Sequence, residues 1–353
     1  MTSNNETILS VMVISHNQCG LIERCLESIL SQKIFSPWEV VISDDASTDG
    51  TWDIIQNYVA KYSEESVLGV DGFYIPQITC SQINSSDYSP TVTSDRCAAN
   101  KANVYMHANG KYCVNIDADD YLIGDDIYQY QISQLEAHPE CSMSMQNILI
   151  LNDGDILTDG KPWRFDAYLE NEILSLEDYC RRSLFISNPA FMMRRDVSLN
   201  PMQKYGLLFD DPVISMHHIL QGSIVCTTKT QYVYVAYKNS IWNSVKNDDS
   251  VVRLLTPLIV YNLFFPNYMN QFILLENWTW VRELKKCVSY TRKMNVSDST
   301  LAYVKRLNNQ FITKLIAKQN VLACRIVLYI SLFIGKTGFS PLFLRKILSR
   351  LIS

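Results

Sequence analysis

The stretch Lys111-Tyr-Cys-Val-Asn-Ile-Asp-Ala-Asp-Asp120 carries the strongest indication of the fold of the chain. Its first half is rich in β-forming residues and follows a glycine, which predicts a short buried strand. Three carboxylates then arrive within four residues, where that strand must end. On an extended backbone Asp117 and Asp119 project to the same face, about 7 Å apart. Such a pair can hold a hard divalent cation together with substrate phosphate oxygens; an acidic turn or a structural calcium loop is the alternative.

Two apolar segments upstream predict neighbouring strands. Ile8–Ser15 is almost wholly apolar, as in a strand covered on both faces, and apolar residues at helical spacing follow over 21–30. Trp38–Ser43 predicts a second strand, which ends in the acidic turn Asp44–Gly50, and a second helix follows over 52–62. Alternation of strand and helix is typical of a parallel, doubly wound α/β sheet. Ligands bind such sheets at the carboxyl ends of the strands, where both acidic turns are expected.

The rest of the first 240 residues continues the mixed pattern. Residues 64–94 show no regular period. Beyond them we expect helices over 95–109, 127–137 and 209–222, and strands over 143–151, 189–195 and 232–237. Proline near the first turn and acids at the positive end of the helix dipole suit the predicted helix start at Phe209-Asp-Asp-Pro212.

Composition restricts the class of protein. The chain has 353 residues, of which 47% are hydrophobic and 19% charged, as in a folded globular protein. Its ten cysteines are scattered, without Cys-x-x-Cys pairs, and we interpret them as reduced core residues of a cytosolic protein. The polar start Met1–Glu6 predicts no signal peptide.

Charge is distributed unevenly along the chain. Of 31 Lys and Arg residues, 14 fall in 282–353, where only Glu283 and Asp298 are acidic, so the net charge of −5 divides into +12 for this tail and −17 for the rest. Val321–Gly335 is apolar but shorter than the roughly 20 residues of a membrane span. Ser340–Ser353 predicts a basic amphipathic helix of the kind that lies on an anionic membrane surface; docking on the chain's own catalytic domain is the alternative.

Several motifs, each weak alone, occur together in a characteristic order and spacing. They are Ser10–Asn17, Trp38–Thr51, Arg96–Asn100, Ala108–Tyr112, Ile116–Asp120 and Phe209–Asp211. The set covers residues 8 to about 240 and resembles the family 2 glycosyltransferases, similar to those that make bacterial surface polysaccharides. The resemblance implies an α/β fold of the GT-A type over 1–245, with a donor-binding half of about 1–122 and an acceptor half of about 123–245. The remaining 246–353 would form an α-helical C-terminal region.

The resemblance also implies a site for a nucleotide-sugar donor. Asp45 would accept a hydrogen bond from the base, with Asp44 as a second contact or a helix cap. His16 stands where relatives place an aromatic residue against the base. Arg96 stands where the family often has an arginine near the donor, and a structural salt bridge is an equal alternative. Arg194 and the following arginine would touch a phosphate or form a solvated strand end.

Metal and catalytic residues follow from the same motifs. Asp117 would face the ribose or the metal, and Asp119 would bind Mn²⁺ or Mg²⁺, while Asp120 would orient the loop or take part. Asp211 would be the catalytic base, with repulsion from Asp210 raising one of the two pKa values. A helix N-cap, for which an aspartate before Pro212 is ordinary, is the alternative role for Asp211.

We therefore expect a metal-dependent, inverting glycosyltransferase that is peripheral on the cytosolic face of a membrane. It would transfer a sugar from a nucleotide-diphosphate donor, a UDP-sugar, to a hydroxyl of a lipid-linked saccharide. The family's Tyr-Arg-x-His appears as Tyr237-Lys-Asn-Ser240, without a histidine ligand, and the motif of processive synthases is absent. A degenerate scaffold is one alternative, and a sugar nucleotidyltransferase is another, although residues 16–20 lack that class's basic glycine-rich loop. The basic tail carries no nucleic-acid-binding motif, so we expect no nucleic-acid partner.

Overall fold

The computed structural model describes residues 6–84, 87, 93–163, 168–176, 178, 190–206 and 209–237. They belong to the first of two compact units, Met1–Asn243. The predicted C-terminal helices of 246–353, with the proposed membrane segment, lie outside the described residues. Among the described helices, none combines the length and apolar composition that crossing a bilayer requires.

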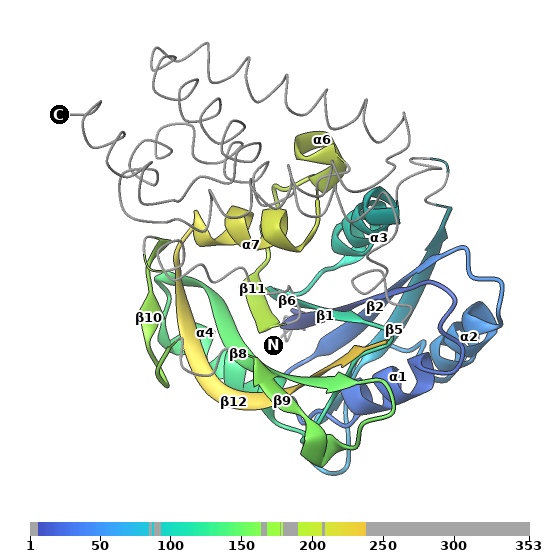
Figure 1. Ribbon diagram of the computed structural model, residues 1–353, viewed down its shortest axis with the longest axis horizontal. Helices are drawn as coiled ribbons and strands as arrows, with labels where there is room; N and C mark the ends of the chain where they lie inside the picture. The colour runs from blue at the N-terminus through green and yellow to red at the C-terminus, as the bar shows by residue number, and fades with distance from the viewer. Residues whose placement is uncertain are drawn as a thin grey trace, which may run out of the picture. The chain divides into compact units, whose positions relative to one another are not determined.

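One large sheet holds the first unit together (Figure 1). Its strand order is β5-β2-β1-β6-β11-β8-β12-β10, with β7 paired to β12 and β9 to β8. The strands are β1 Leu9–Ser15, β2 Trp38–Asp45, β5 Gln77–Ile83, β6 Tyr112–Asp117, β7 Tyr121–Leu122, β8 Cys141–Asn152, β9 Lys161–Trp163, β10 Ile173–Leu174, β11 Phe191–Arg194 and β12 Ser223–Ala236. A separate hairpin joins β3 Val67–Leu68 to β4 Tyr74–Ile75.

The sheet has a parallel half and a mixed half. Strands β5, β2, β1 and β6 run parallel, whereas β11 is antiparallel to both β6 and β8. The long pairing of β8 with β12 is again parallel. The expected α/β fold class, with a largely parallel sheet centred on the β6 stretch, is confirmed.

Helices cover both faces of this sheet. They are α1 Ile22–Leu30, α2 Thr51–Lys61, α3 Thr93–His107, α4 Ile127–Ala137, α6 Pro201–Lys204 and α7 Asp211–Ile219. Figure 1 shows α1 and α2 on one face and α3 and α7 on the other. The apolar face of α1 is fully buried, as its helical spacing of apolar residues predicted.

Among the longer strands, β5 was not predicted from the sequence and β12 was predicted only in part. Strand β5 lies in the stretch that shows no regular period; it is an edge strand with mostly half-exposed polar residues, so it lacks a buried apolar face. Strand β12 begins at Ser223 rather than 232, and its register shifts between Cys226 and Tyr232, where polar residues interrupt the apolar pattern. A strand with an irregular register loses the period on which the prediction depends.

The register brings both acidic turns to one edge of the sheet. Ser15 at the end of β1 pairs with Asp44 of β2, and Ile14 pairs with Asp117 of β6. Gly110 fixes the start of β6, because a Cβ there would lie 2.5 Å from the Ser10 backbone nitrogen. Beyond β1 and β2 the chain turns through left-handed conformations at Asn17 and Ala46, and such strain collects at functional sites.

Candidate active site

The turn after β2 is built around Asp44. Its carboxylate is fully buried and accepts hydrogen bonds from the Ser15 hydroxyl at 2.8 Å, the Ser47 amide at 2.9 Å and the Gln82 amide group at 2.9 Å. The Ser47 hydroxyl is a further donor. These contacts use both carboxylate oxygens, so Asp44 supports the turn from within, and its predicted contact with the base stays untested.

Asp45 lies beside it, at the edge of the site. Arg96 on α3 donates to the Asp45 carboxylate at 3.0 Å, which is the salt bridge that the sequence left open as an alternative. His16 is half-exposed, and its Nδ1 lies 2.6 Å from the Asp45 backbone oxygen. The structure therefore brings His16, Asp45 and Arg96 together as the expected base-binding group, and the nucleotide contacts remain predictions.

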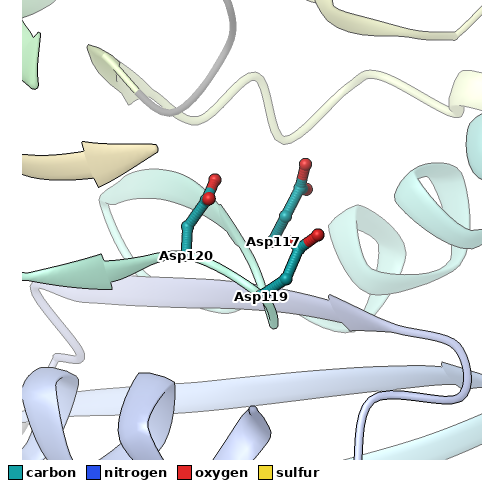
Figure 2. Close-up of side chains that lie close together, drawn as sticks. All are labelled: Asp117, Asp119 and Asp120. Carbon is teal, nitrogen blue, oxygen red and sulfur yellow. The ribbon is translucent and has the colours of Figure 1, made fainter. Parts of the chain in front are cut away.

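The carboxylates after β6 form a tight cluster. Asp117, Asp119 and Asp120 each offer a ligand oxygen, and these oxygens all lie within 4.8 Å of one another (Figure 2). They are closer than an extended strand allows, because β6 ends at Asp117 and the Asp120 amide donates to the Asp117 backbone oxygen at 2.9 Å. The resulting turn points the side chains in the same direction (Figure 2).

Asp120 is the anchor of this cluster. Both of its oxygens accept hydrogen bonds from β12, one from the Tyr232 hydroxyl and one from the Val235 amide at 3.0 Å. Across the turn, Arg24 on α1 donates to the Asp119 backbone oxygen at 3.1 Å and stacks over the Tyr121 ring. With Asp120 tied to the protein, Asp117 and Asp119 are the carboxylates best able to bind an ion.

The electrostatics of the cluster favour a cation. The pKa of Asp117 is raised to about 7: burial is the largest cause, the Lys101 ammonium opposes it, and the charge of Asp119 adds to the rise. Burial also raises the pKa of Asp119, and burial and the neighbouring carboxylates raise that of Asp120. Hard oxygen ligands this close together fit Mn²⁺ or Mg²⁺, which would relieve the repulsion.

The N-terminus of α7 supplies a second acidic pair. Asp210 is the helix cap, because its side chain accepts from the Asp211 amide at 2.9 Å, and Asp211 is the first helical residue. The N-cap, which was the alternative role expected for Asp211, thus belongs to Asp210 instead. The ammonium of Lys101 on α3 donates to Asp210 at 2.7 Å and also to the Asp211 carboxylate.

Arg194 at the end of β11 and Arg195 directly after it lie away from the carboxylate cluster. Arg194 pairs in register with Tyr112 at the opposite end of β6 from Asp117, and its guanidinium donates to the Cys141 backbone oxygen at 2.7 Å. Arg195 donates to the Gly110 backbone oxygen at 2.8 Å. Both side chains therefore join elements of the fold, and the phosphate contact that was one of their two expected roles stays a prediction.

Sequence reasoning missed Lys101, Arg24 and Tyr232. Lys101 lies in the middle of a helix and Tyr232 in the middle of a strand, so neither is marked by a turn or a motif. A signal was available for Lys101, because a lysine beside Asn100 within an otherwise small and apolar helix face is unusual for a buried segment.

Comparisons with known proteins relate the chain to glycosyltransferases. The family model described as Glycosyl transferase family 2 matches residues 10–68. An uncharacterized protein of Mycobacterium tuberculosis is 28% identical over 245 residues, 68% of this chain and 62% of that protein. The putative glycosyltransferase EpsE of Bacillus subtilis is 28% identical over 42% of this chain and 46% of its own. The poly(ribitol-phosphate) beta-glucosyltransferase of Bacillus spizizenii is 28% identical over 32% of this chain and 15% of its own.

Among solved structures, S. aureus TarS 1–349 in complex with UDP-GlcNAc aligns over 89% of this chain and 92% of that one, with 17% identity and a TM-score of 0.49. The chain spans about 62% of the length of the mycobacterial relatives that it matches. By the family match and the named relatives, the chain is similar to the family 2 glycosyltransferases.

Proposed function

We propose that the protein is a metal-dependent, inverting glycosyltransferase of the hexosyl type that uses a UDP-sugar or another nucleotide-diphosphate sugar. Its acceptor would be a hydroxyl of a lipid-linked saccharide in surface-polysaccharide assembly. The observation that carries the proposal is that one buried lysine, Lys101, connects both acidic groups: it binds Asp210 and Asp211 and lies in the field of Asp117. A cation site and a candidate base therefore lie close together, as transfer from a diphosphate donor requires.

The chain's own residues suggest how the donor is held. Asp45, fixed by Arg96, would accept a hydrogen bond from a base N–H, with His16 against the ring. Asp117 and Asp119 would hold Mn²⁺ or Mg²⁺, which neutralises the charge that develops on the leaving nucleoside diphosphate. Arg24, which lies over the Asp119 turn, adds positive charge at that edge.

Asp211 would take part on the opposite side of the sugar. An acceptor hydroxyl attacks the anomeric carbon, the bond from that carbon to the phosphate oxygen breaks, and the hydroxyl proton passes to the Asp211 carboxylate. Because attack and departure occur on opposite sides in one displacement, the anomeric configuration inverts. Asp117 and Asp119 do not serve as the base, because they are committed to the leaving-group side.

The acceptor and the location depend on other observations. The relative named poly(ribitol-phosphate) beta-glucosyltransferase supports an acceptor from the class of cell-surface polymers. The net charge of +12 over 282–353 supports attachment to an anionic membrane. Cosedimentation with anionic vesicles checks the attachment, since we expect loss of binding when Val321–Ser353 is deleted; equal binding by the shortened chain would contradict it.

A screen of nucleotide sugars tests the activity. We expect the full chain to release a nucleoside diphosphate from at least one donor in the presence of Mn²⁺ or Mg²⁺, and to stop when the metal is chelated. Asp211→Asn should lower kcat by about 10²–10⁴ with nearly unchanged donor affinity, because it removes the base while Asp210 still caps α7. No turnover of any donor would contradict the function, and a product that keeps the donor's anomeric configuration would contradict the mechanism.

A further inference from the structure

Lys101 is buried in the first unit and yet charged. Only 6% of its side chain is exposed, and its ammonium binds Asp210 at 2.7 Å and also Asp211. Burial lowers the pKa of Lys101, but the carboxylates of Asp210, Asp211 and Asp117 outweigh that effect, so the pKa lies well above its ordinary value. A buried cation at this place is costly unless carboxylates pair with it, so the arrangement fixes the positions of all the partners.

The backbone beside Lys101 is itself held in place. Asn100 donates to the Ser15 backbone oxygen at 3.2 Å, and its side-chain oxygen accepts from the Ser43 hydroxyl. These contacts attach α3 to the carboxyl ends of β1 and β2, where the donor-binding turns begin. Lys101 therefore lies on a part of α3 that is attached to the ends of β1 and β2, and its ammonium forms ion pairs with Asp210 and Asp211 at the start of α7.

We propose that Lys101 is a positioning residue, which holds the Asp211 carboxylate in place for proton transfer through an ion pair that it shares with Asp210. The inference rests on the proposed function, in which Asp211 is the base. The Lys101 ammonium needs two carboxylate partners rather than one. When Asp211 accepts a proton its negative charge is lost, and Asp210 then keeps the buried ammonium paired.

The split between kcat and KM distinguishes this role from a purely structural one. Lys101→Met keeps the length and volume of the side chain and removes the charge. We expect kcat to fall by about 10–100-fold, as for a misplaced catalytic group, with the donor KM within about twofold. Lys101→Arg should recover part of the loss, because it restores the ion pair. A higher donor KM with unchanged kcat would overturn the inference and assign Lys101 to the donor.

A double variant tests the route through Asp211. If Lys101 acts by holding that carboxylate, Lys101→Met combined with Asp211→Asn is no slower than Asp211→Asn alone. If the two single losses of kcat multiply in the double variant, Lys101 acts independently of Asp211, and the inference is overturned. Lys111→Met is the matched control: Lys111 pairs with Glu136, is half-exposed, and lies at the far end of β6, so its loss should leave both parameters unchanged.

A spectroscopic readout separates this inference from the proposed function. The carboxyl ¹³C signal of Asp211, identified by its loss in Asp211→Asn, should move in Lys101→Met and return toward its wild-type position in Lys101→Arg. An unmoved signal overturns the inference even if the wild-type chain transfers no sugar. An inactive wild type with a shifted signal contradicts the function alone. If Lys101→Met does not fold, Lys101→Arg is the test. The guanidinium is longer than the ammonium and planar, so it alters the ion pair with Asp210 and Asp211. If that pair holds the base, the Asp211 carboxyl signal moves from its wild-type position and kcat falls.

Discussion

The two acidic turns at the edge of the sheet contain the same residue type in opposite surroundings. After β2, Asp44 is saturated by four hydrogen bonds from Ser15, Ser47 and Gln82. After β6, Asp117 and Asp119 face each other and Asp120 at short range, and repulsion and burial raise the pKa of Asp117 to about 7. Only Asp120 of that second turn has both oxygens occupied by the protein.

This difference distinguishes a carboxylate that stabilises the fold of the site from carboxylates that are available to bind a ligand. Asp44 already has its hydrogen-bond partners in the folded chain, so we expect its removal to lower mainly the free energy of unfolding. In Asp117 and Asp119 burial and repulsion outweigh the protein's own stabilising contacts, and a bound cation would relieve the repulsion, so we expect their removal to affect mainly metal binding and turnover. One sheet edge therefore combines a turn whose carboxylate is fully hydrogen-bonded with a turn whose carboxylates repel one another.

The largest effect should come from Asp119→Asn. Exchange of a charged ligand for a neutral oxygen weakens the metal site, so we expect turnover to fall by about 10²-fold or more, equal to about 3 kcal/mol of barrier. The stability without metal should change little or rise slightly, because one repelling charge is gone. Steady-state rates across a Mn²⁺ titration measure this, and near-wild-type turnover would show that Asp119 is not a ligand.

Asp44→Asn should have a smaller effect, and on a different property. The amide nitrogen would face donors that now point at a carboxylate, which should lower the free energy of unfolding by about 1–3 kcal/mol. Urea denaturation of the metal-free chain compares it with Asp119→Asn, which is the same chemical change in the other turn. Equal losses of stability in the two variants would remove the distinction between the turns.

The smallest effect should be a pH dependence of stability. The pKa of Asp117 is raised from 3.8 to about 7, so its contribution to stability is complete below about pH 4 and is lost as the pH rises through 7. We expect the metal-free melting temperature to fall by a few degrees between pH 5 and 8. Mn²⁺ needs the ionised carboxylate, so the stabilisation that it gives should grow over the same range. Asp117→Asn is the control and should flatten both trends; parallel curves for the two chains would contradict the assignment.

The sequence predicted what is local and could not predict what is assembled from distant segments. Strands β1, β2 and β6 were predicted because continuous apolar runs and an adjacent turn identify a buried parallel strand. The expected site residues follow directly after those strands, so their shared edge was predictable from topology alone. The distinction between Asp44 and Asp45 was not, because it depends on Gln82, which comes from the missed edge strand β5. The pairing of Lys101 with Asp211 joins residues 110 positions apart, and no local pattern reports such a contact.

The bonds between Asp120 and β12 have a consequence for how the protein is made. Tyr232 and Val235 follow Asp120 by 112 and 115 residues, so the turn that holds the carboxylates has its anchor only after β12 has left the ribosome. A nascent chain that ends before β12 contains every acidic residue of the cluster and the Arg24 contact to the turn, but it lacks both hydrogen bonds to the Asp120 carboxylate. The arrangement of the three carboxylates is therefore completed late in synthesis, by a strand from the other half of the sheet.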